Sequence, residues 1–366
     1  MLLYISPLIG QTISIKKIDR NNHSSLFWII ISFAIVYIII YGLRDYGGAD
    51  DFSYKLYYEQ NYGGSFFQIF ATDKEPLFNV LKYIGYTFHF NYKFVFLGYA
   101  VFQIVFLSLG IKNYYNNKTD AILYISSFLF ISYSAIFTTM RQAAAMTVLF
   151  FMYSIKDLKW KKRIILWILL IFCHYGFIIL LPIELLMTIK KYKVSNKTKI
   201  VVPIVCYLVG HIIKLNELIS FITRTLGMFN YMNSESNYSH SSNLGIVIWI
   251  LFILYVFNII YSGYKNKPSA DEKEQQSNAV SFGQMMYFSL IFLTSEMRWA
   301  NRLSYYYLLF VPIIIIRFFK SFSFKTSNDS IIVKYILISI MYVLFIIVMK
   351  NVLGEEGYVW SLNFFN

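Results

Sequence analysis

Long apolar runs are the feature that most limits what this chain can fold into. Runs of about 18 to 20 apolar residues recur along its whole length, and each is long enough to cross a hydrocarbon core of about 30 Å as a helix. Charged residues make up 14% of the chain, whereas soluble domains contain roughly a quarter. An ordinary soluble domain is therefore excluded. The sequence predicts an all-α, polytopic membrane protein with about 10 to 12 transmembrane helices, built as a single membrane-embedded domain over residues 1–366.

Most apolar runs are expected to cross the membrane directly. These runs are 1–15, 26–43, 93–111, 120–139, 141–157, 199–214, 245–264, 282–297, 301–319 and 331–349. Two further stretches need separate treatment. Residues 76–90 are too short and too polar to cross alone, so we expect an interfacial or re-entrant helix there. Residues 164–189 form one long apolar stretch that His174, Tyr175 and Gly176 divide into two short arms.

The basic residues predict an orientation. If the linker after the first span is inside, 22 of the 33 Lys and Arg residues lie inside and 11 outside, which follows the positive-inside rule. Both flanks of 164–189 are then inside, so this segment must go out and return, with His174 near the outer turn. The polar linker 265–281 falls inside as a flexible cytoplasmic loop. The amino terminus lacks a basic region and a cleavage site ahead of Lys16 and is expected to be a retained span.

The net charge of +14 thus reports membrane topology, because the basic residues lie in short linkers between spans. Nucleic acid is not an expected partner. No His pair or regularly spaced carboxylates accompany Asp50 and Asp51, and the two cysteines, Cys173 and Cys206, lie in apolar segments. We therefore expect no metal site, no disulfide framework and no cofactor.

A polar, aromatic and acidic loop over residues 44–92 interrupts the apolar runs on the outside. Long loops between spans usually carry function, so we interpret this one as the roof of an extracytoplasmic active site. Its carboxylates Asp50, Asp51 and Glu75 are candidates to accept a proton or orient a hydroxyl, although a solvated loop surface explains any one of them equally simply. Its aromatic residues, Tyr54 among them, suit sugar rings or a membrane interface.

Arginine is enriched on the outer side, although that side has fewer basic residues overall. The outer arginines are Arg44, Arg141, Arg224, Arg298 and Arg302. Since Lys would serve topology equally well, their planar forks favour binding of phosphate or carboxylate. Arg141 begins an apolar run at the outer boundary, where a charge lines a cavity or snorkels to the interface.

Three other ionisable residues are weaker candidates. His174 is either a functional group inside the membrane or a satisfied core residue. Arg298 and Arg302 share one helical face if the helix persists through them, and either can instead be an interfacial anchor beside Trp299. Arg302 lies just inside the next expected span and is the stronger of the two.

Four short motifs follow one another in order along the amino-terminal half. They are Arg44-x-x-x-Gly48-x-Asp50-x-x-x-Tyr54, then Glu75-Pro76-Leu77-Phe78, then Arg141-Gln142-x-x-Ala145, and then His174 in FCHYGFIILLP. This order resembles the EpsG-type branch of the Wzy polysaccharide polymerases, which act in exopolysaccharide, capsule and O-antigen assembly. Arg302 in NRLSYYYLLFVP looks like the late Arg of that family.

The resemblance implies a GT-C-like fold in the cytoplasmic (inner) membrane, with an active site facing the periplasm or cell exterior. It implies a polymerase in which a hydroxyl of an undecaprenyl-pyrophosphate-linked oligosaccharide attacks the reducing-end anomeric carbon of the growing chain. Undecaprenyl pyrophosphate is then the leaving group. Membrane lipid and a chain-length regulator protein are the other expected partners.

The resemblance assigns two kinds of role to residues of this sequence, binding of the pyrophosphate and action on the acceptor hydroxyl. Arg44, Arg141 and Arg302 would hold the pyrophosphate, while Glu75, Asp50 or His174 would position or deprotonate the acceptor hydroxyl. The candidates for substrate binding are Tyr54 and Gln142, which belong to the motifs, and Arg298, which the resemblance does not support.

Two other functions stay open. A GT-C glycosyltransferase that uses a polyprenyl-phosphate sugar would depend more on an outer-loop carboxylate, often with a metal. A transporter or flippase of the lipid-linked oligosaccharide would show internal repeats and charges through the bilayer depth. Here the charges cluster on one side, which favours the polymerase over the transporter.

Overall fold

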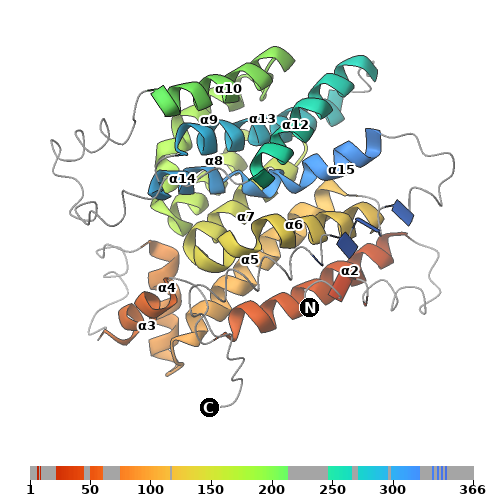
Figure 1. The fold of residues 1–366 in the computed structure, drawn as a ribbon. Coiled ribbons are helices and arrows are strands. Elements are labelled where there is room, and N and C mark those ends of the chain that lie inside the picture. Colours follow the sequence, from red (N-terminus) through yellow and green to blue (C-terminus); the bar gives the residue numbers. More distant parts are fainter. Residues whose placement is uncertain are drawn as a thin grey trace. The chain divides into compact units, whose positions relative to one another are not determined.

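The fold is that of a computed structural model, which describes residues 6, 7, 9, 22–44, 50–60, 75–115, 118–212, 246–265, 271–295, 298–321, 332, 333, 336, 337, 339, 340 and 343. Over these residues the chain forms helices joined by turns, with no strand (Figure 1). The expected all-α class is therefore confirmed there. Two compact units are distinguished, residues 1–179 with 323–366 and residues 180–322, and each is described by itself. That the chain is a single membrane-embedded domain stays a prediction.

The first unit is built around α7. Its helices are α2 (Asn22–Tyr37), the π-helix η1 (Ile38–Gly42), α3 (Asp51–Glu59), α4 (Pro76–Thr87), α5 (Lys93–Tyr114), α6 (Lys118–Thr138), α7 (Met140–Ser154) and α8 (Trp160–Cys173). Helix α7 packs against α5, α6 and α8, and its residues are buried along nearly the whole helix. The small side chains Ala143, Ala144 and Ala145 let these neighbours approach closely.

Helices α3 and α4 lie together beside one end of α2 and α5, which pack against each other (Figure 1). Tyr58 on α3 stacks on Tyr86 of α4, with ring centroids 4.9 Å apart, and donates to the carbonyl of Phe90. The expected helix within 76–90 is thus present as α4, while α3 is an additional helix that the sequence did not predict. The stretches 45–49 and 61–74 of the expected outer loop lie outside the described residues.

The second unit contains α9 (Leu181–Ile189), α10 (Asn196–Ile212), α12 (Ile246–Lys265), α13 (Asp271–Leu293), α14 (Arg298–Tyr305), the 3-10 helix η6 (Leu308–Phe310) and α15 (Pro312–Ser321). Its core is aromatic, with Trp249 of α12 stacked on Phe292 of α13 at 5.0 Å. Glu184 on α9 is buried, and its carboxylate accepts hydrogen bonds from Tyr307 at 2.6 Å and Tyr192 at 3.3 Å.

The break expected at His174, Tyr175 and Gly176 is confirmed. Helix α8 ends at Cys173, His174 is extended, and the 3-10 helix η3 (Tyr175–Leu180) leads into α9. Whether these arms go out and return across a membrane stays a prediction.

Two expected boundaries are wrong. The span expected over 301–319 is divided into α14, η6 and α15, because Pro312 has no N–H to donate and its ring clashes with the preceding turn of an α-helix. The loop expected over 265–281 is helical from Asp271. The run of Glu, Lys and Gln after Pro268 consists of strong helix formers, and it continues directly into the apolar part of α13.

One described helix, α5 with its 22 residues, is both long and apolar enough to cross a bilayer on its own. Shorter apolar helices cover Leu26–Gly42, Tyr175–Ile189 and Ile246–Tyr261. The expected spans 1–15 and 331–349 fall largely outside the described residues. The number of crossings and the relation to the GT-C fold therefore stay predictions.

The approach of α10 to α13 yields a test of the second unit. A Cβ at Gly210 would lie 2.7 Å and 2.8 Å from the carbonyl oxygens of Phe292 and Leu293. Gly210→Ala gains about 1 kcal/mol of helix propensity but costs about 1–3 kcal/mol because backbone must move. We expect a lower thermal midpoint in detergent, with Val205→Ala, an exposed change on the same helix, as the control. A midpoint higher than that of the wild-type chain would contradict the close approach.

Candidate active site in the first unit

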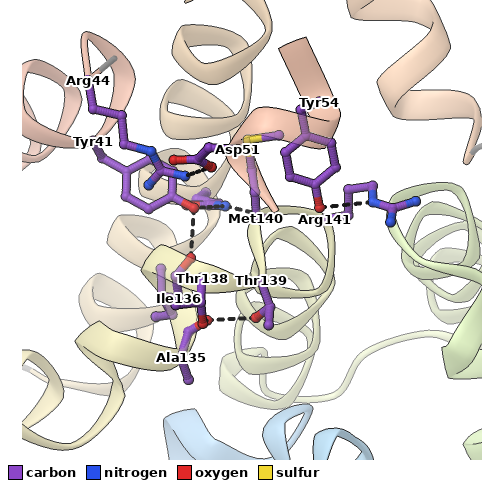
Figure 2. A network of polar contacts seen from close by, with 11 residues as sticks. Tyr41, Arg44, Asp51, Tyr54, Ala135, Ile136, Thr138, Thr139, Met140 and Arg141 are labelled. Atoms are coloured by element: carbon purple, nitrogen blue, oxygen red, sulfur yellow. Dashed lines mark hydrogen bonds and ion pairs between the residues drawn. The ribbon is translucent and has the colours of Figure 1, made fainter. Parts of the chain in front are cut away.

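Arg141 occupies the junction between α6 and α7. Thr139 interrupts the helices, with φ −118° and ψ 61°, and its hydroxyl donates to the Ala135 carbonyl at 2.6 Å. Helix α7 then starts at Met140, so Arg141 lies in its first turn, where the guanidinium can reach beyond the helix end. Figure 2 shows this side chain extending toward Tyr54 of α3. The sequence placed Arg141 at the start of this helix, and the structure agrees.

Two side chains from the 44–92 segment hold the Arg141 guanidinium. Its Nη1 forms an ion pair with Glu75 Oε2, and its Nε donates to the Tyr54 hydroxyl at 3.2 Å (Figure 2). The guanidinium carbon also lies 5.3 Å from the centre of the Tyr54 ring. The Arg141 side chain nevertheless remains 22% exposed, against 7% for Glu75. Arg141 is therefore held in place and still reachable from outside.

Glu75 is placed by the start of α4. It is the N-cap residue, in an extended conformation, and Pro76 occupies the first helical position, which suits proline. Its carbonyl accepts from Phe78 and Asn79, whereas its carboxylate makes no capping hydrogen bond. The carboxylate is thus available to Arg141 rather than to its own helix.

Tyr54 is fixed by aromatic packing against Phe78 of α4, at 5.7 Å, and Phe96 of α5, at 6.5 Å. Burial raises the pKa of Tyr54 to about 12, more than the nearby Arg141 lowers it. The hydroxyl is therefore protonated at neutral pH. It accepts from Arg141 and keeps its own proton to donate. The pKa of Tyr54 also responds to the charge of the half-buried Asp50, which places that carboxylate nearby.

A second ion pair lies deeper in the same unit. Arg44 Nη2 contacts Asp51 Oδ1 at 2.6 Å, with side-chain exposures of 4% and 1% (Figure 2). The Arg44 guanidinium lies 4.4 Å from the Tyr41 ring and 5.2 Å from the Phe96 ring. The sequence singled out both Asp50 and Asp51, and it proposed Asp50 for the site. The structure pairs Asp51 with Arg44, and the role of Asp50 stays a prediction.

Gln103 is a functional candidate that sequence reasoning missed. It is buried in the middle of α5, where its Nε2 donates to the Met140 carbonyl at 2.9 Å and its Oε1 accepts from Tyr37 at 2.6 Å. The neighbouring Tyr41 hydroxyl donates to the Ile136 carbonyl at 2.7 Å (Figure 2). These bonds fix the backbone on both sides of the α6–α7 junction. An amide inside an otherwise apolar run was the signal that could have revealed it.

His174 follows α8, which packs against α4. The backbone N–H of Gly176 donates to His174 Nδ1 at 3.2 Å. Its neighbours Cys173 and Tyr175 both lie within electrostatic range of the Glu75 carboxylate. The end of α8 is therefore close to the Arg141–Glu75 pair.

The remaining predicted residues differ in their surroundings. Gln142 is buried on α7, so its amide faces protein rather than a solvent-accessible space. Arg302 is exposed on α14 of the second unit. Arg298 begins the same helix, and its side chain is outside the described part. The structure thus connects Arg141, Glu75 and Tyr54 directly, while the roles of all the predicted site residues stay predictions.

The Arg44–Asp51 pair yields a stability test. Asp51→Ala leaves the Arg44 charge buried without its carboxylate, which costs about 3–5 kcal/mol. Glu59→Ala instead breaks the exposed Lys55–Glu59 pair, at 3.8 Å, which is worth about 0–1 kcal/mol. We expect a large drop in the thermal midpoint for the first variant and almost none for the second. Equal midpoints would show that the buried pair does not hold α3.

Comparison with known proteins shows a family. The EpsG family model matches residues 25–362, which includes every motif described above. No curated protein and no solved structure gives a significant match. The apolar helix α5 and the family match together indicate a membrane protein. The resemblance seen in the motifs is confirmed, and the chain belongs to the EpsG family, whose members are glycosyltransferase-like polymerases of polysaccharide biosynthesis.

Proposed function

We propose that this chain is a polysaccharide polymerase that joins undecaprenyl-pyrophosphate-linked oligosaccharide units. We place the reaction at the outer face of the cytoplasmic membrane, with a multi-pass arrangement as the basic linkers predict. The observation that carries the proposal is the Arg141 guanidinium, which Tyr54 and Glu75 hold in place while 22% of its side chain stays exposed. A fixed and reachable guanidinium suits a diphosphate, because its planar fork matches phosphate oxygens.

In the reaction, a hydroxyl of one lipid-linked unit attacks the anomeric carbon that carries the pyrophosphate of the growing chain. The bond from that carbon to the pyrophosphate oxygen breaks, and undecaprenyl pyrophosphate leaves with the electron pair. Negative charge develops on this leaving group, and a preorganised cation beside it lowers the barrier. Arg141 supplies that cation, and Tyr54 holds the guanidinium in orientation.

Arg44 takes a different role from Arg141 in this proposal. Its side chain is only 4% exposed, and Asp51 already neutralises it, so it orients α3 and thereby Tyr54. Asp50 and His174 remain candidates to orient the acceptor. A role for Arg302 and Arg298 in substrate binding stays a prediction.

Arg141→Gln tests the proposal directly. Loss of one preorganised donor to a developing charge typically lowers kcat about 10²–10³-fold, so complemented cells are expected to accumulate single repeat units outside instead of long chains. Lys161→Gln removes one positive charge from an exposed position on α8 and is expected to leave chain length unchanged. Long chains made at normal rate by Arg141→Gln would overturn the proposed site.

Two treatments separate the proposed function from its alternatives. A chelator such as EDTA is expected to leave polymerisation by the purified protein unchanged, whereas a metal-dependent transferase of polyprenyl-phosphate sugars would lose activity. Disruption of the gene is expected to leave single repeat units outside the cell. Repeat units trapped inside would indicate a flippase instead.

A further inference from the structure

The Arg141 guanidinium is occupied by an anion of the protein itself. Glu75 forms an ion pair with its Nη1. The proposed function, however, assigns the same guanidinium to the substrate diphosphate. We propose that the diphosphate displaces Glu75 from Arg141, and that the released carboxylate is the base that accepts the proton of the acceptor hydroxyl. This inference rests on the proposed function and adds which carboxylate is the base and what holds it inactive in the empty site.

The Arg44–Asp51 and Arg141–Glu75 ion pairs of the first unit differ in whether their partners can be exchanged. The Arg44 and Asp51 side chains are 4% and 1% exposed and lie among aromatic rings, so an anion from outside cannot reach them. Arg141 is 22% exposed. Between Asp51 and Glu75, it is therefore Glu75 whose arginine partner substrate can contact.

Glu75 can leave Arg141 without disturbing the local fold. Helix α4 begins with the Glu75 backbone carbonyl and Pro76, and the carboxylate takes no part in the cap. Arg141 for its part keeps the Tyr54 hydroxyl at Nε, so the guanidinium stays aimed when its Nη1 partner changes. The exchange needs only a rotation of the Glu75 side chain.

Charge favours the exchange. A diphosphate diester carries about two negative charges at neutral pH and several oxygens that fit the guanidinium fork, whereas a carboxylate carries one charge. Release from the guanidinium also frees the carboxylate oxygens to accept a hydrogen bond from the acceptor hydroxyl. Substrate binding thus produces the base at the moment when the leaving group is in place.

The chemical step transfers one proton to Glu75 and exchanges one carbon–oxygen bond for another at the anomeric carbon. Glu75 takes the proton of the acceptor hydroxyl, the hydroxyl oxygen bonds to the anomeric carbon, and the carbon–oxygen bond to pyrophosphate breaks with its electron pair leaving on undecaprenyl pyrophosphate. Glu75 afterwards releases the proton to solvent. The carboxylate is then charged again, and its return to Arg141 helps to expel the product.

His174 is less suited to be the base in this arrangement. Its Nδ1 accepts the Gly176 N–H at 3.2 Å, so a proton taken at Nδ1 would replace a hydrogen bond by a repulsion between two donors. The neutral ring carries its proton on Nε2 when Nδ1 accepts. His174 therefore acts as a hydrogen-bond donor.

Binding of undecaprenyl pyrophosphate to the purified full chain in lipid nanodiscs tests the exchange. If Glu75 competes with the diphosphate for Arg141, removing its charge strengthens binding. If Glu75 only supports Arg141, removing its charge does not strengthen binding. Removing the competing charge with Glu75→Gln is expected to tighten binding about three- to tenfold, while turnover falls about 10²-fold or more because the base is lost. Glu59→Gln removes an equal charge from an exposed site and is expected to change neither quantity.

The outcomes distinguish the inference from the proposed function. Weaker or equal binding by Glu75→Gln would show that Glu75 only supports Arg141, and would overturn the exchange while leaving the polymerase proposal intact. If the wild-type chain binds no undecaprenyl pyrophosphate, both proposals fail. Should Glu75→Gln not fold, Glu75→Asp serves instead, since its shorter side chain weakens the ion pair but keeps a base. Tighter binding with partial turnover is then expected, and weaker binding overturns the exchange.

Discussion

The ion pair between Arg141 and Glu75 organises the outer part of the first unit. A guanidinium at the end of the buried helix α7 would be costly without a partner. Its partners come from other segments of the chain, from the residue before α4 and from α3. The segments that carry Glu75 and Tyr54 must therefore fold over the end of α7 for the charge to be compensated. One charge thus ties three stretches, distant in sequence, to a single point.

The deeper pair, Arg44 with Asp51, complements this arrangement by being inaccessible. It connects the end of η1 to the first residue of α3, and Gln103 and Tyr41 secure the α6–α7 junction nearby. The arginines that the sequence grouped as equal phosphate ligands are therefore separated by burial. Arg44 is enclosed by protein, whereas the Arg141 side chain is 22% exposed, and of these two Arg141 is suited to exchange partners.

Sequence patterns predicted the helical class and the break at His174, since each follows from local composition. They also singled out Arg141, Glu75 and Tyr54, which the structure brings into contact and whose roles stay predictions. They proposed Asp50 for the site and could not show that Asp51 pairs with Arg44. That pairing depends on where α3 begins, because a shift of one residue turns a side chain by about 100°. Gln103 was missed because its role depends on contacts with Met140, which lies 37 positions later in the chain, and with Tyr37, which lies 66 positions earlier. Pro312 was a visible signal for the divided span over 301–319.

The π-helix η1 has a consequence for how sequence length is constrained here. A π turn contains one residue more than an α turn closed by the usual hydrogen bond, so Ile38–Gly42 advances the chain out of phase with α2. Gly42, whose hypothetical Cβ would lie 3.1 Å from the Leu97 backbone, then passes close to α5. The number of residues in η1 consequently sets the direction in which the Arg44 side chain points. Deleting one residue of η1 would leave Arg44 and Asp51 chemically unchanged and still turn the guanidinium away from its carboxylate.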